Sequence, residues 1–333
     1  MRRAEATYAV AVTHDPGLAS LADRAMIPEG GRALTSLLPA RTMPALNPLS
    51  MKETRLVAQL GIVKQRDPAL CALRLRTVGG DLTTAQLRTI ISVAERFGQG
   101  KVHLSTRQGV EIHGVLKSDA EAAIAELAAG GVSMGAGGSR VRVVGACPGN
   151  SWCRYGAINT KDLAAALDRE HFASEMPYKV KMNVTGCPNN CGKARENDIG
   201  LMGVTVPAWA EDKCSDCGKC VELCPTHSIT KDGDRYLSDK DTCIKCSVCT
   251  TLCPTGAWKA ETTGIRVLAG GTMGKKPRLG TVIADLIEDP EEALALVRKV
   301  LAVYRAEGRS NERLGHTMDR IGLDEFNRRV AAQ

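Results

Sequence analysis

Twelve of the 13 cysteines in this 333-residue chain fall into three groups of four, and Cys71 alone stands apart. Two of the groups are repeated runs with the spacing C-x2-C-x2-C-x3-C-P, which begin at Cys214 and Cys243. The third group is divided between two segments, ACPGNSWC and TGCPNNCGKA. Thiolates in such clusters bind zinc or iron–sulfur centres, and an odd number of cysteines excludes complete disulfide pairing. The spacing therefore predicts metal centres.

The two repeated runs have the spacing of iron–sulfur ligands, in which three thiolates surround one cube and the fourth reaches another cube. Zinc sites also use C-x2-C pairs, but not three cysteines plus a Cys-Pro, twice. Over roughly residues 211–257 the chain resembles the bacterial two-cluster ferredoxins. The resemblance implies two [4Fe–4S] clusters. Their ligands would be Cys214, Cys217, Cys220 and Cys253 for the first, and Cys243, Cys246, Cys249 and Cys224 for the second.

The remaining four cysteines lie in two loops, as Cys147 and Cys153 in C-x5-C and as Cys187 and Cys191 in C-x3-C. Two separate segments that each offer two thiolates would clamp one centre between them. A zinc site, or four unrelated buried thiols, is the alternative. The pair of motifs resembles the signature of the sirohaem sulfite and nitrite reductases. That resemblance implies a third [4Fe–4S] cluster on these four cysteines, with Cys191 also bridging to the iron of sirohaem.

Three predicted strands carry basic residues on one face, because side chains alternate along a strand with a period of two. In CALRLRTVGG, Leu73 and Leu75 alternate with Arg74 and Arg76. SRVRVVGAC and YKVKMNVTGC behave in the same way and run directly into the cysteine pairs. A basic face is usually only the solvated face. Three such strands beside metal ligands instead predict a site for anions, which need fixed cations.

The resemblance to the sulfite and nitrite reductases extends over residues 53–333 and includes LRLRTVGGDLTTAQL and HLSTRQGVEIHG. It implies that basic residues bind the carboxylates of sirohaem and the substrate oxygens. The matching positions are Arg74, Arg107, Arg142, Lys179 and Lys181. It also implies cofactor-binding roles for His113 and for the basic residues of GGTMGKKPRLG, which are Lys275, Lys276 and Arg278. The chain departs from the family by reading EIHG around His113.

The expected fold class is α+β, with a ferredoxin-like half-domain, a sirohaem and [4Fe–4S] domain, and an inserted two-cluster ferredoxin domain. The expected boundaries are 1–52 for an N-terminal extension, 53–118 for the half-domain, 119–206 and 258–333 for the sirohaem domain, and 207–257 for the insertion. Apolar spacing predicts a helix in DLTTAQLRTIISVAERFG, capped by Thr83 or Thr84. An amphipathic helix is expected in DPEEALALVRKVLAVYRAEG, packed on the protein. Cys71 is expected to be a buried apolar residue.

The resemblance implies a six-electron reduction of sulfite to sulfide, with electrons entering through the inserted ferredoxin domain. The order of domains is most similar to the catalytic component of the anaerobic sulfite reductases and to a single subunit of a dissimilatory sulfite reductase. Reduction of nitrite to ammonia at the same site is the nearest alternative. A non-catalytic electron-transfer protein that holds sirohaem and iron–sulfur clusters is another alternative.

The expected partners follow from the same comparison. Assimilatory members contain two such halves, whereas this chain has one, so we expect a homodimer or a complex with a related subunit that donates some of the basic residues. An electron-donor protein or reductase subunits are also expected. The net charge of +7 could indicate nucleic acid, but the basic strands lack aromatic stacking residues, and anionic cofactors explain the charge. No apolar run is long enough to span a membrane, and many unpaired thiols indicate the cytoplasm.

Overall fold

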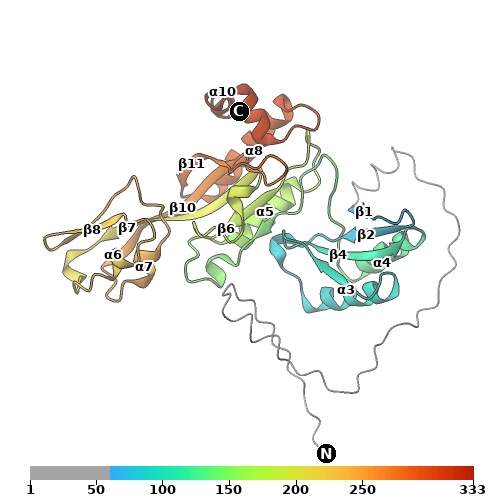
Figure 1. Ribbon diagram of the computed structural model, residues 1–333, viewed down its shortest axis with the longest axis horizontal. Coiled ribbons are helices and arrows are strands. Elements are labelled where there is room, and N and C mark those ends of the chain that lie inside the picture. Colours follow the sequence, from blue (N-terminus) through green and yellow to red (C-terminus); the bar gives the residue numbers. More distant parts are fainter. Residues whose placement is uncertain (1–60) are drawn as a thin grey trace, which may run out of the picture. The chain divides into compact units, whose positions relative to one another are not determined.

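The computed structural model describes residues 61–333 of the chain. The predicted extension, residues 1–52, lies outside the described residues, as do residues 53–60 of the predicted half-domain. The described chain forms a four-stranded sheet, a five-stranded sheet and a two-stranded hairpin, with helices beside them (Figure 1). None of the described helices is long and apolar enough to cross a membrane.

The first sheet is antiparallel, with strand order β1-β2-β4-β3. Its strands are β1 (Ile62–Lys64), β2 (Leu70–Arg74), β3 (Val102–Leu104) and β4 (Val110–Leu116). The predicted alternation in β2 is confirmed, because Leu73 and Leu75 are buried while Arg74 is half-buried. Cys71 is buried as predicted, and this burial raises the pKa of its thiol to about 11.

The predicted strand CALRLRTVGG is shorter than expected, because β2 ends at Arg74. Beyond it the backbone forms a short 3-10 helix at Val78–Gly80, where Gly79 and Gly80 have positive φ angles of 62° and 79°. Side-chain-bearing residues rarely adopt such angles, so this glycine pair permits the tight turn that follows the strand. Other 3-10 helices lie at Lys117–Asp119, Gly149–Ser151, Ala194–Glu196 and Glu211–Lys213.

Two helices, α3 (Thr84–Arg96) and α4 (Ala120–Ala129), pack on this sheet. Thr83 caps α3 as predicted, through a capping box in which its side chain accepts from the Gln86 backbone and the Gln86 side chain accepts from the Thr83 backbone. Ile90 and Ala94 are buried, as their spacing predicts. Leu87 and Ile91 are instead 42% and 51% exposed, because α3 buries the face that also carries Val93.

The second sheet has the order β11-β10-β7-β6-β5 and is mixed. Its strands are β5 (Gly145–Ala146), β6 (Met182–Thr185), β7 (Ile199–Trp209), β10 (Trp258–Ala269) and β11 (Thr281–Ile287). Strands β5, β6 and β7 are parallel, while β10 pairs antiparallel with both β7 and β11. The strands predicted before the cysteine pairs are shorter than expected, since β5 has two residues and β6 has four. An isolated bridge between Val141 and Val180 precedes them.

The helices of this part are α5 (Thr160–His171), α8 (Pro290–Glu307), α9 (Leu314–Ile321) and α10 (Leu323–Ala331). The amphipathic helix predicted near the C-terminus is confirmed as α8, capped by Asp289. It buries Val297, Val300 and Tyr304 in the same core cluster as the sheet. This core fixes the strands from which the cysteine loops emerge.

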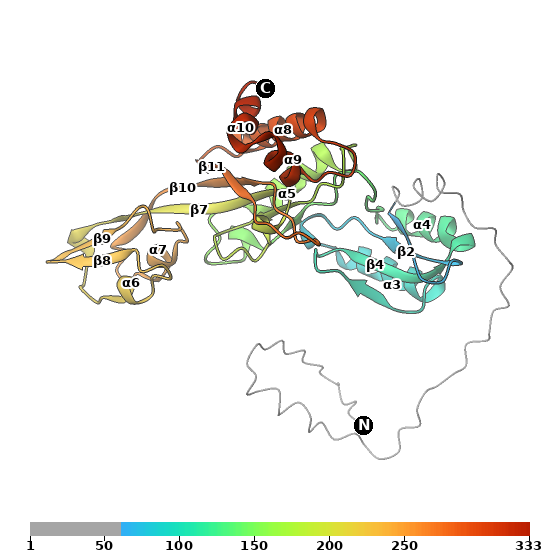
Figure 2. The ribbon, with the colours of Figure 1, turned by 45° about the horizontal axis from the view of Figure 1, so that its top comes forward.

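The chain between β7 and β10 forms a small unit of its own, reached along these two long strands (Figures 1 and 2). It contains α6 (Lys219–Glu222), α7 (Val248–Leu252) and the hairpin of β8 (Ile229–Asp232) and β9 (Arg235–Ser238). Its core consists of Cys224, Ile229, Tyr236 and Trp258. The α+β fold class predicted from the sequence is confirmed by this mixture of helices and sheets.

Candidate functional site

The two cysteine loops of the third group leave neighbouring strands at the same edge of the sheet. Strands β5 and β6 are parallel, with Ala146 opposite Val184. Cys147 directly follows β5, and Cys187 comes two residues after β6 ends. Because carboxyl ends of parallel strands meet at one edge, both loops start from neighbouring points. The Gly186 backbone N–H donates to Cys147 Sγ at 3.1 Å, which joins the loops directly.

The four thiols influence one another electrostatically. Burial raises the pKa of Cys187, and the neighbouring thiolates of Cys191, Cys147 and Cys153 raise it further. The loops are also tightly packed, because a Cβ atom on Gly192 would lie 2.4 Å from the carbonyl oxygen of Val184. Cys147 and Cys187 are buried, Cys153 is half-buried and Cys191 is exposed. The exposed Cys191 is the member of the set best able to meet a second group.

Within residues 61–333 no group of three or more His, Cys, Asp or Glu side chains is drawn together tightly enough for a single metal ion. A [4Fe–4S] cube is larger than one ion and separates its four thiolates. Two loops that each offer two thiols can accommodate such a cube. We call this set the thiol site, made of Cys147, Cys153, Cys187 and Cys191.

The other eight cysteines line two small cavities in the unit between β7 and β10. Each cavity has a volume of about 20 Å³. Each run contributes its first three cysteines to one cavity and its fourth to the other. The first cavity is lined by Cys214, Cys217, Cys220 and Cys253, and the second by Cys243, Cys246, Cys249 and Cys224. These are the two sets expected from the sequence.

Hydrogen-bond donors surround these sulfur atoms. The buried indole N–H of Trp258 lines the first cavity and has no partner in hydrogen-bond geometry. It lies near Cys220, whose pKa is raised by burial and lowered in part by this indole. In the second cavity, burial raises the pKa of Cys224, but hydrogen bonds from Ser228 and Thr226 outweigh it and lower the pKa to about 7. Unpartnered donors beside thiols fit clusters whose sulfur atoms carry negative charge.

A third cavity, of about 300 Å³, gathers the five basic residues that the sequence selected. We call it the basic cavity. The first sheet supplies Arg74 and the loop after β3 supplies Arg107, whereas Arg142, Lys179 and Lys181 come from the segments that lead into β5 and β6. The cavity thus brings together residues from the first sheet and from the second. Glu111, which the sequence did not single out, also lines the cavity and pairs with Arg74 at 2.8 Å.

The cations of the basic cavity are crowded. Burial, and then the charges of neighbouring cations, lower the pKa of Arg107 to about 10 and that of Lys181 to about 8. The pKa of Arg142 also falls to about 10, through burial and the charge of Arg74. Arg107 Nη2 donates to the carbonyl oxygen of Val143 at 3.1 Å, but its buried Nε has no partner. A buried donor without a partner among crowded cations fits an anionic ligand.

Asn183 on β6 connects the basic cavity with the thiol site. Its Oδ1 accepts from Arg107 Nη2 at 3.2 Å, and its Nδ2 donates to the carbonyl oxygen of Gly192 at 2.7 Å. Gly192 directly follows Cys191. One buried amide therefore holds Arg107 on one side and the loop of the exposed cysteine on the other.

Residues outside the sequence predictions hold the first sheet against the second. The Gln108 side chain donates to the carbonyl oxygen of Ala146 at 2.8 Å and accepts from its N–H at 3.0 Å. Lys161 Nζ donates to the carbonyl oxygen of Gly79 at 2.6 Å. Thr160 Oγ1 donates to the carbonyl oxygen of Cys147 at 2.6 Å. The Gln108 and Lys161 bonds tie segments next to the first sheet to β5 and α5, and the Thr160 bond ties α5 to the first cysteine loop.

The family comparison agrees with this geometry. The model of the nitrite and sulphite reductase 4Fe-4S domain matches residues 137–333, and that of the nitrite/sulfite reductase ferredoxin-like half domain matches residues 63–130. The chain belongs to the nitrite and sulfite reductase family. The first match covers the thiol site, and the second covers Arg74 and Arg107.

Three relatives place the chain within this reductase family. It is 34% identical to the coenzyme F420-dependent sulfite reductase of Methanocaldococcus jannaschii over 81% of this chain, but it spans only 43% of that protein. It is 30% identical to an anaerobic sulfite reductase subunit of Salmonella typhimurium, over 80% of this chain and 84% of the relative. The fold matches a crystal structure of dissimilatory sulfite reductase I with a TM-score of 0.67 and 22% identity, over 79% of this chain and 69% of that one.

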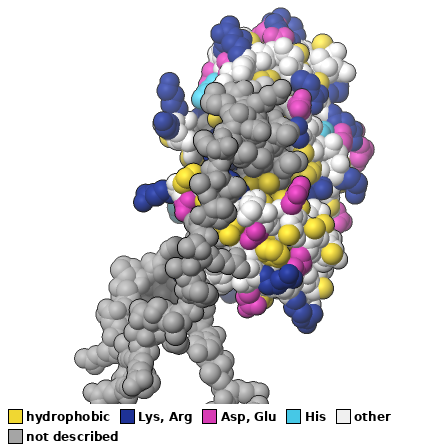
Figure 3. Space-filling model, turned by 90° about the vertical axis from the view of Figure 1, so that its right-hand side faces the viewer, with side chains coloured by type: hydrophobic (Ala, Val, Ile, Leu, Met, Phe, Trp, Pro, Cys, Tyr) yellow, Lys and Arg dark blue, Asp and Glu magenta, His cyan; other side chains and the backbone are white. Residues whose placement is uncertain are grey.

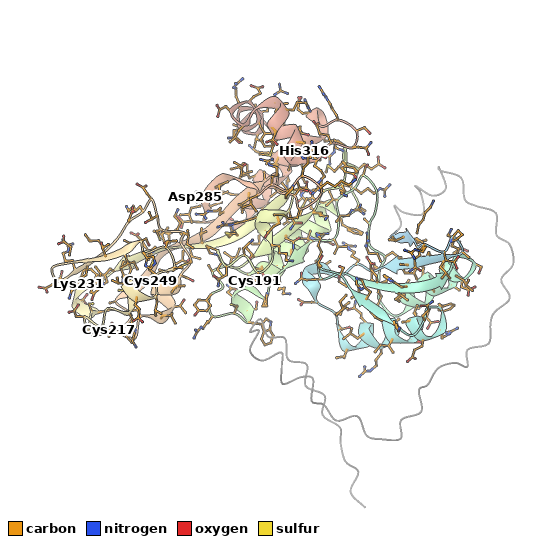
Figure 4. All side chains as sticks on the ribbon, viewed as in Figure 1. Cys191, Cys217, Lys231, Cys249, Asp285 and His316 are labelled. Carbon is orange, nitrogen blue, oxygen red and sulfur yellow. The ribbon has the colours of Figure 1, made fainter. Side chains whose placement is uncertain are left out.

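The remaining residues selected from the family resemblance lie elsewhere. His113 contacts Glu111 at 3.1 Å but does not line the basic cavity. Lys276 and Arg278 line a different, open cavity of about 530 Å³, and Lys275 lines neither cavity. Figure 4 shows His316, which also lines that open cavity, beside the C-terminal helices. Their cofactor-binding roles stay predictions of the family resemblance.

Proposed function

We propose that this protein is the catalytic component of a sulfite reductase, which reduces sulfite to sulfide. The observation that carries the proposal is the basic cavity, joined through Asn183 to the loop of Cys191. In this proposal Cys147, Cys153, Cys187 and Cys191 would hold a [4Fe–4S] cluster, and Cys191 would be the ligand that couples it to sirohaem. The names of the relatives support the same reaction.

The reaction consumes six electrons and six protons for each sulfite, releases three oxygen atoms as water and leaves sulfide. When bound, sirohaem and the clusters supply the electrons, which enter through residues 207–257. Arg107 and Lys181 neutralise the negative oxygens of the substrate, and this stabilises the charge that shifts onto them as each S–O bond weakens. With its pKa near 8, Lys181 can also give up a proton near neutral pH.

We propose three [4Fe–4S] clusters, two of them on the eight cysteines of residues 207–257. The two cavities and their hydrogen-bond donors support this assignment. In this proposal residues 207–257 form an inserted ferredoxin domain. Its second cavity adjoins the thiol site, because Ser247 Oγ donates to the carbonyl oxygen of Tyr155 at 3.4 Å. Ser247 follows Cys246, and Tyr155 comes two residues after Cys153.

We further propose that the chain works in a cytoplasmic complex, as a homodimer or with a related subunit and an electron donor. The relative named as a subunit supports association with other subunits. The many cysteines without disulfides support a reducing compartment. On the face drawn in Figure 3, Lys and Arg side chains are interspersed with Asp and Glu side chains.

The absorption spectrum of anaerobically purified protein, with its iron and sulfide content, tests the proposal. We expect sirohaem bands, four irons for each cluster and faster turnover of sulfite than of nitrite. Cys191→Ser should lose the sirohaem coupling, whereas the control Cys71→Ala should keep it, because Cys71 lies in the core of the first sheet. Iron–sulfur absorbance without sirohaem would refute the enzyme and favour an electron-transfer protein. Faster nitrite turnover would identify a nitrite reductase instead.

A further inference from the structure

The two cysteine runs differ in the residues that follow their fourth cysteine. The first run continues as Cys-Pro-Thr-His-Ser from Cys224 to Ser228, and the second as Cys-Pro-Thr-Gly-Ala from Cys253 to Ala257. Ser228 therefore occupies the position that Ala257 has in the other copy. A serine and an alanine at matched positions differ only by one hydroxyl group.

The extra hydroxyl lies against a sulfur atom. Ser228 is 3% exposed, and its Oγ lies 3.2 Å from Cys224 Sγ, while its backbone N–H donates to the same sulfur at 3.3 Å. The threonine contacts are alike in both copies. Thr226 Oγ1 lies 3.8 Å from Cys224 Sγ, and Thr255 Oγ1 lies 3.7 Å from Cys253 Sγ. Backbone N–H groups face Cys253 as well. The Ser228 hydroxyl thus has no counterpart in the second run.

The cavity that Cys224 completes is the one next to the thiol site. Cys246, another member of its set, forms a bridge with Thr205 of β7, and the neighbouring Ser247 bonds to Tyr155. In Figure 4 Cys249 of this set lies between Cys217 of the other set and Cys191. An electron that enters at the first cavity therefore has to pass the second on its way to Cys191.

Hydrogen bonds to cluster sulfur atoms change how readily a cluster is reduced. The reduced cluster carries one more negative charge, so a donor to its thiolate stabilises it more than the oxidised cluster. The reduction potential therefore rises. A second cluster with a higher potential than the first would draw electrons towards the thiol site.

We propose that Ser228 is a positioning residue whose hydroxyl raises the reduction potential of the cluster held by Cys224 and so favours electron flow towards the thiol site. This inference rests on the proposed function, because it requires clusters in both cavities. The residue acts through Cys224 and does not touch the substrate. The repeat supplies a matched test, since each copy can be given the residue of the other.

The test is a redox titration of the full-length holoprotein, followed by electron paramagnetic resonance. We expect Ser228→Ala to make reduction of one cluster about tenfold less favourable, a fall of about 59 mV for a one-electron couple. Ala257→Ser should raise the potential of a different cluster, and Ser228→Thr should keep the wild-type value. Ala257→Ser removes no existing contact, so it tests the inference even if Ser228→Ala fails to assemble.

The outcomes separate this inference from the proposed function. Wild-type protein without [4Fe–4S] signals would refute the proposed clusters themselves. Intact signals whose potentials are the same in wild type, Ser228→Ala and Ala257→Ser would overturn only the role of Ser228. A change in the same cluster in both variants would also overturn it, because the two positions contact different sulfur atoms.

Discussion

Lys181 should make anion binding depend on pH. Burial and then the charges of Arg107, Arg313 and Lys179 together lower its pKa to about 8, against the opposing charge of Asp198. Below about pH 8 the side chain is a cation in the basic cavity, and above it the cation is lost. A bound anion favours the protonated form, so the affinity for an anion should fall as the pH rises through about 8.

The size of this effect follows from the type of contact. A hydrogen bond from a charged donor is worth about 1.5–3 kcal/mol, which corresponds to about a ten- to 150-fold change in affinity. If one proton is taken up with each anion, the dissociation constant should rise up to about tenfold for each pH unit above the pKa. Arg107 and Arg142, with pKa values of about 10, stay mostly charged up to about pH 9.

The assay is calorimetric or spectroscopic titration of the anaerobic holoprotein with nitrite, from about pH 6.5 to about pH 9. Nitrite is the suitable probe because it stays a monoanion throughout. Lys181→Met should bind weakly with no dependence on pH, and Lys181→Arg should bind tightly with no dependence on pH. The exposed Lys101→Met is the control and should follow the wild type. The reasoning is refuted if the pH slope of the wild type persists in Lys181→Met.

Three further predictions concern the residues that hold the site. Asp198→Asn should destabilise the fold by about 3–5 kcal/mol in chemical denaturation, because it leaves the bidentate partner Arg313 as an uncompensated buried charge; a loss below about 1 kcal/mol would contradict this. Gln108→Leu should leave two backbone groups beside β5 without partners, at about 1–3 kcal/mol each, and hydrogen exchange of the β5 amides should accelerate. Asn183→Asp should keep the acceptor for the arginine but lose the donor to Gly192, so the iron content should fall without loss of fold by circular dichroism; unchanged iron would count against the link.

The spacing of the cysteines predicted which of them lie together. The spacing within each cysteine run determines which thiols can meet, and the structure places Cys253 with the first run and Cys224 with the second. The alternation in β2 placed Arg74 away from the core, because a strand turns its side chains to opposite faces. The same period placed Lys179 and Lys181 on one side, and both line the basic cavity.

Long-range contacts could not be predicted in this way. Gln108 bonds to Ala146, and Arg313 bonds to Asp198. The partners in each pair lie too far apart in the sequence for the period of a helix or strand to bring them together. Asn183 appears in the sequence as an ordinary polar residue within an apolar strand. Its partners become visible only when β6 lies between the arginine and the cysteine loop. The exposure of Leu87 could not be predicted either, because it depends on which face of α3 packs against the sheet.

The basic cavity has the properties of a binding site and not those of a solvated basic face, because its cations are buried close to one another. Cations on a solvated face keep their ordinary pKa values, because water screens them from one another. In the cavity, burial and mutual repulsion lower the pKa of Arg107, Arg142 and Lys181, and Glu111 is the one acidic residue among the lining side chains of the described chain. This arrangement is unfavourable for the empty protein and becomes favourable when an anion enters. The crowding of these cations therefore supports the proposal that the basic cavity binds an anion.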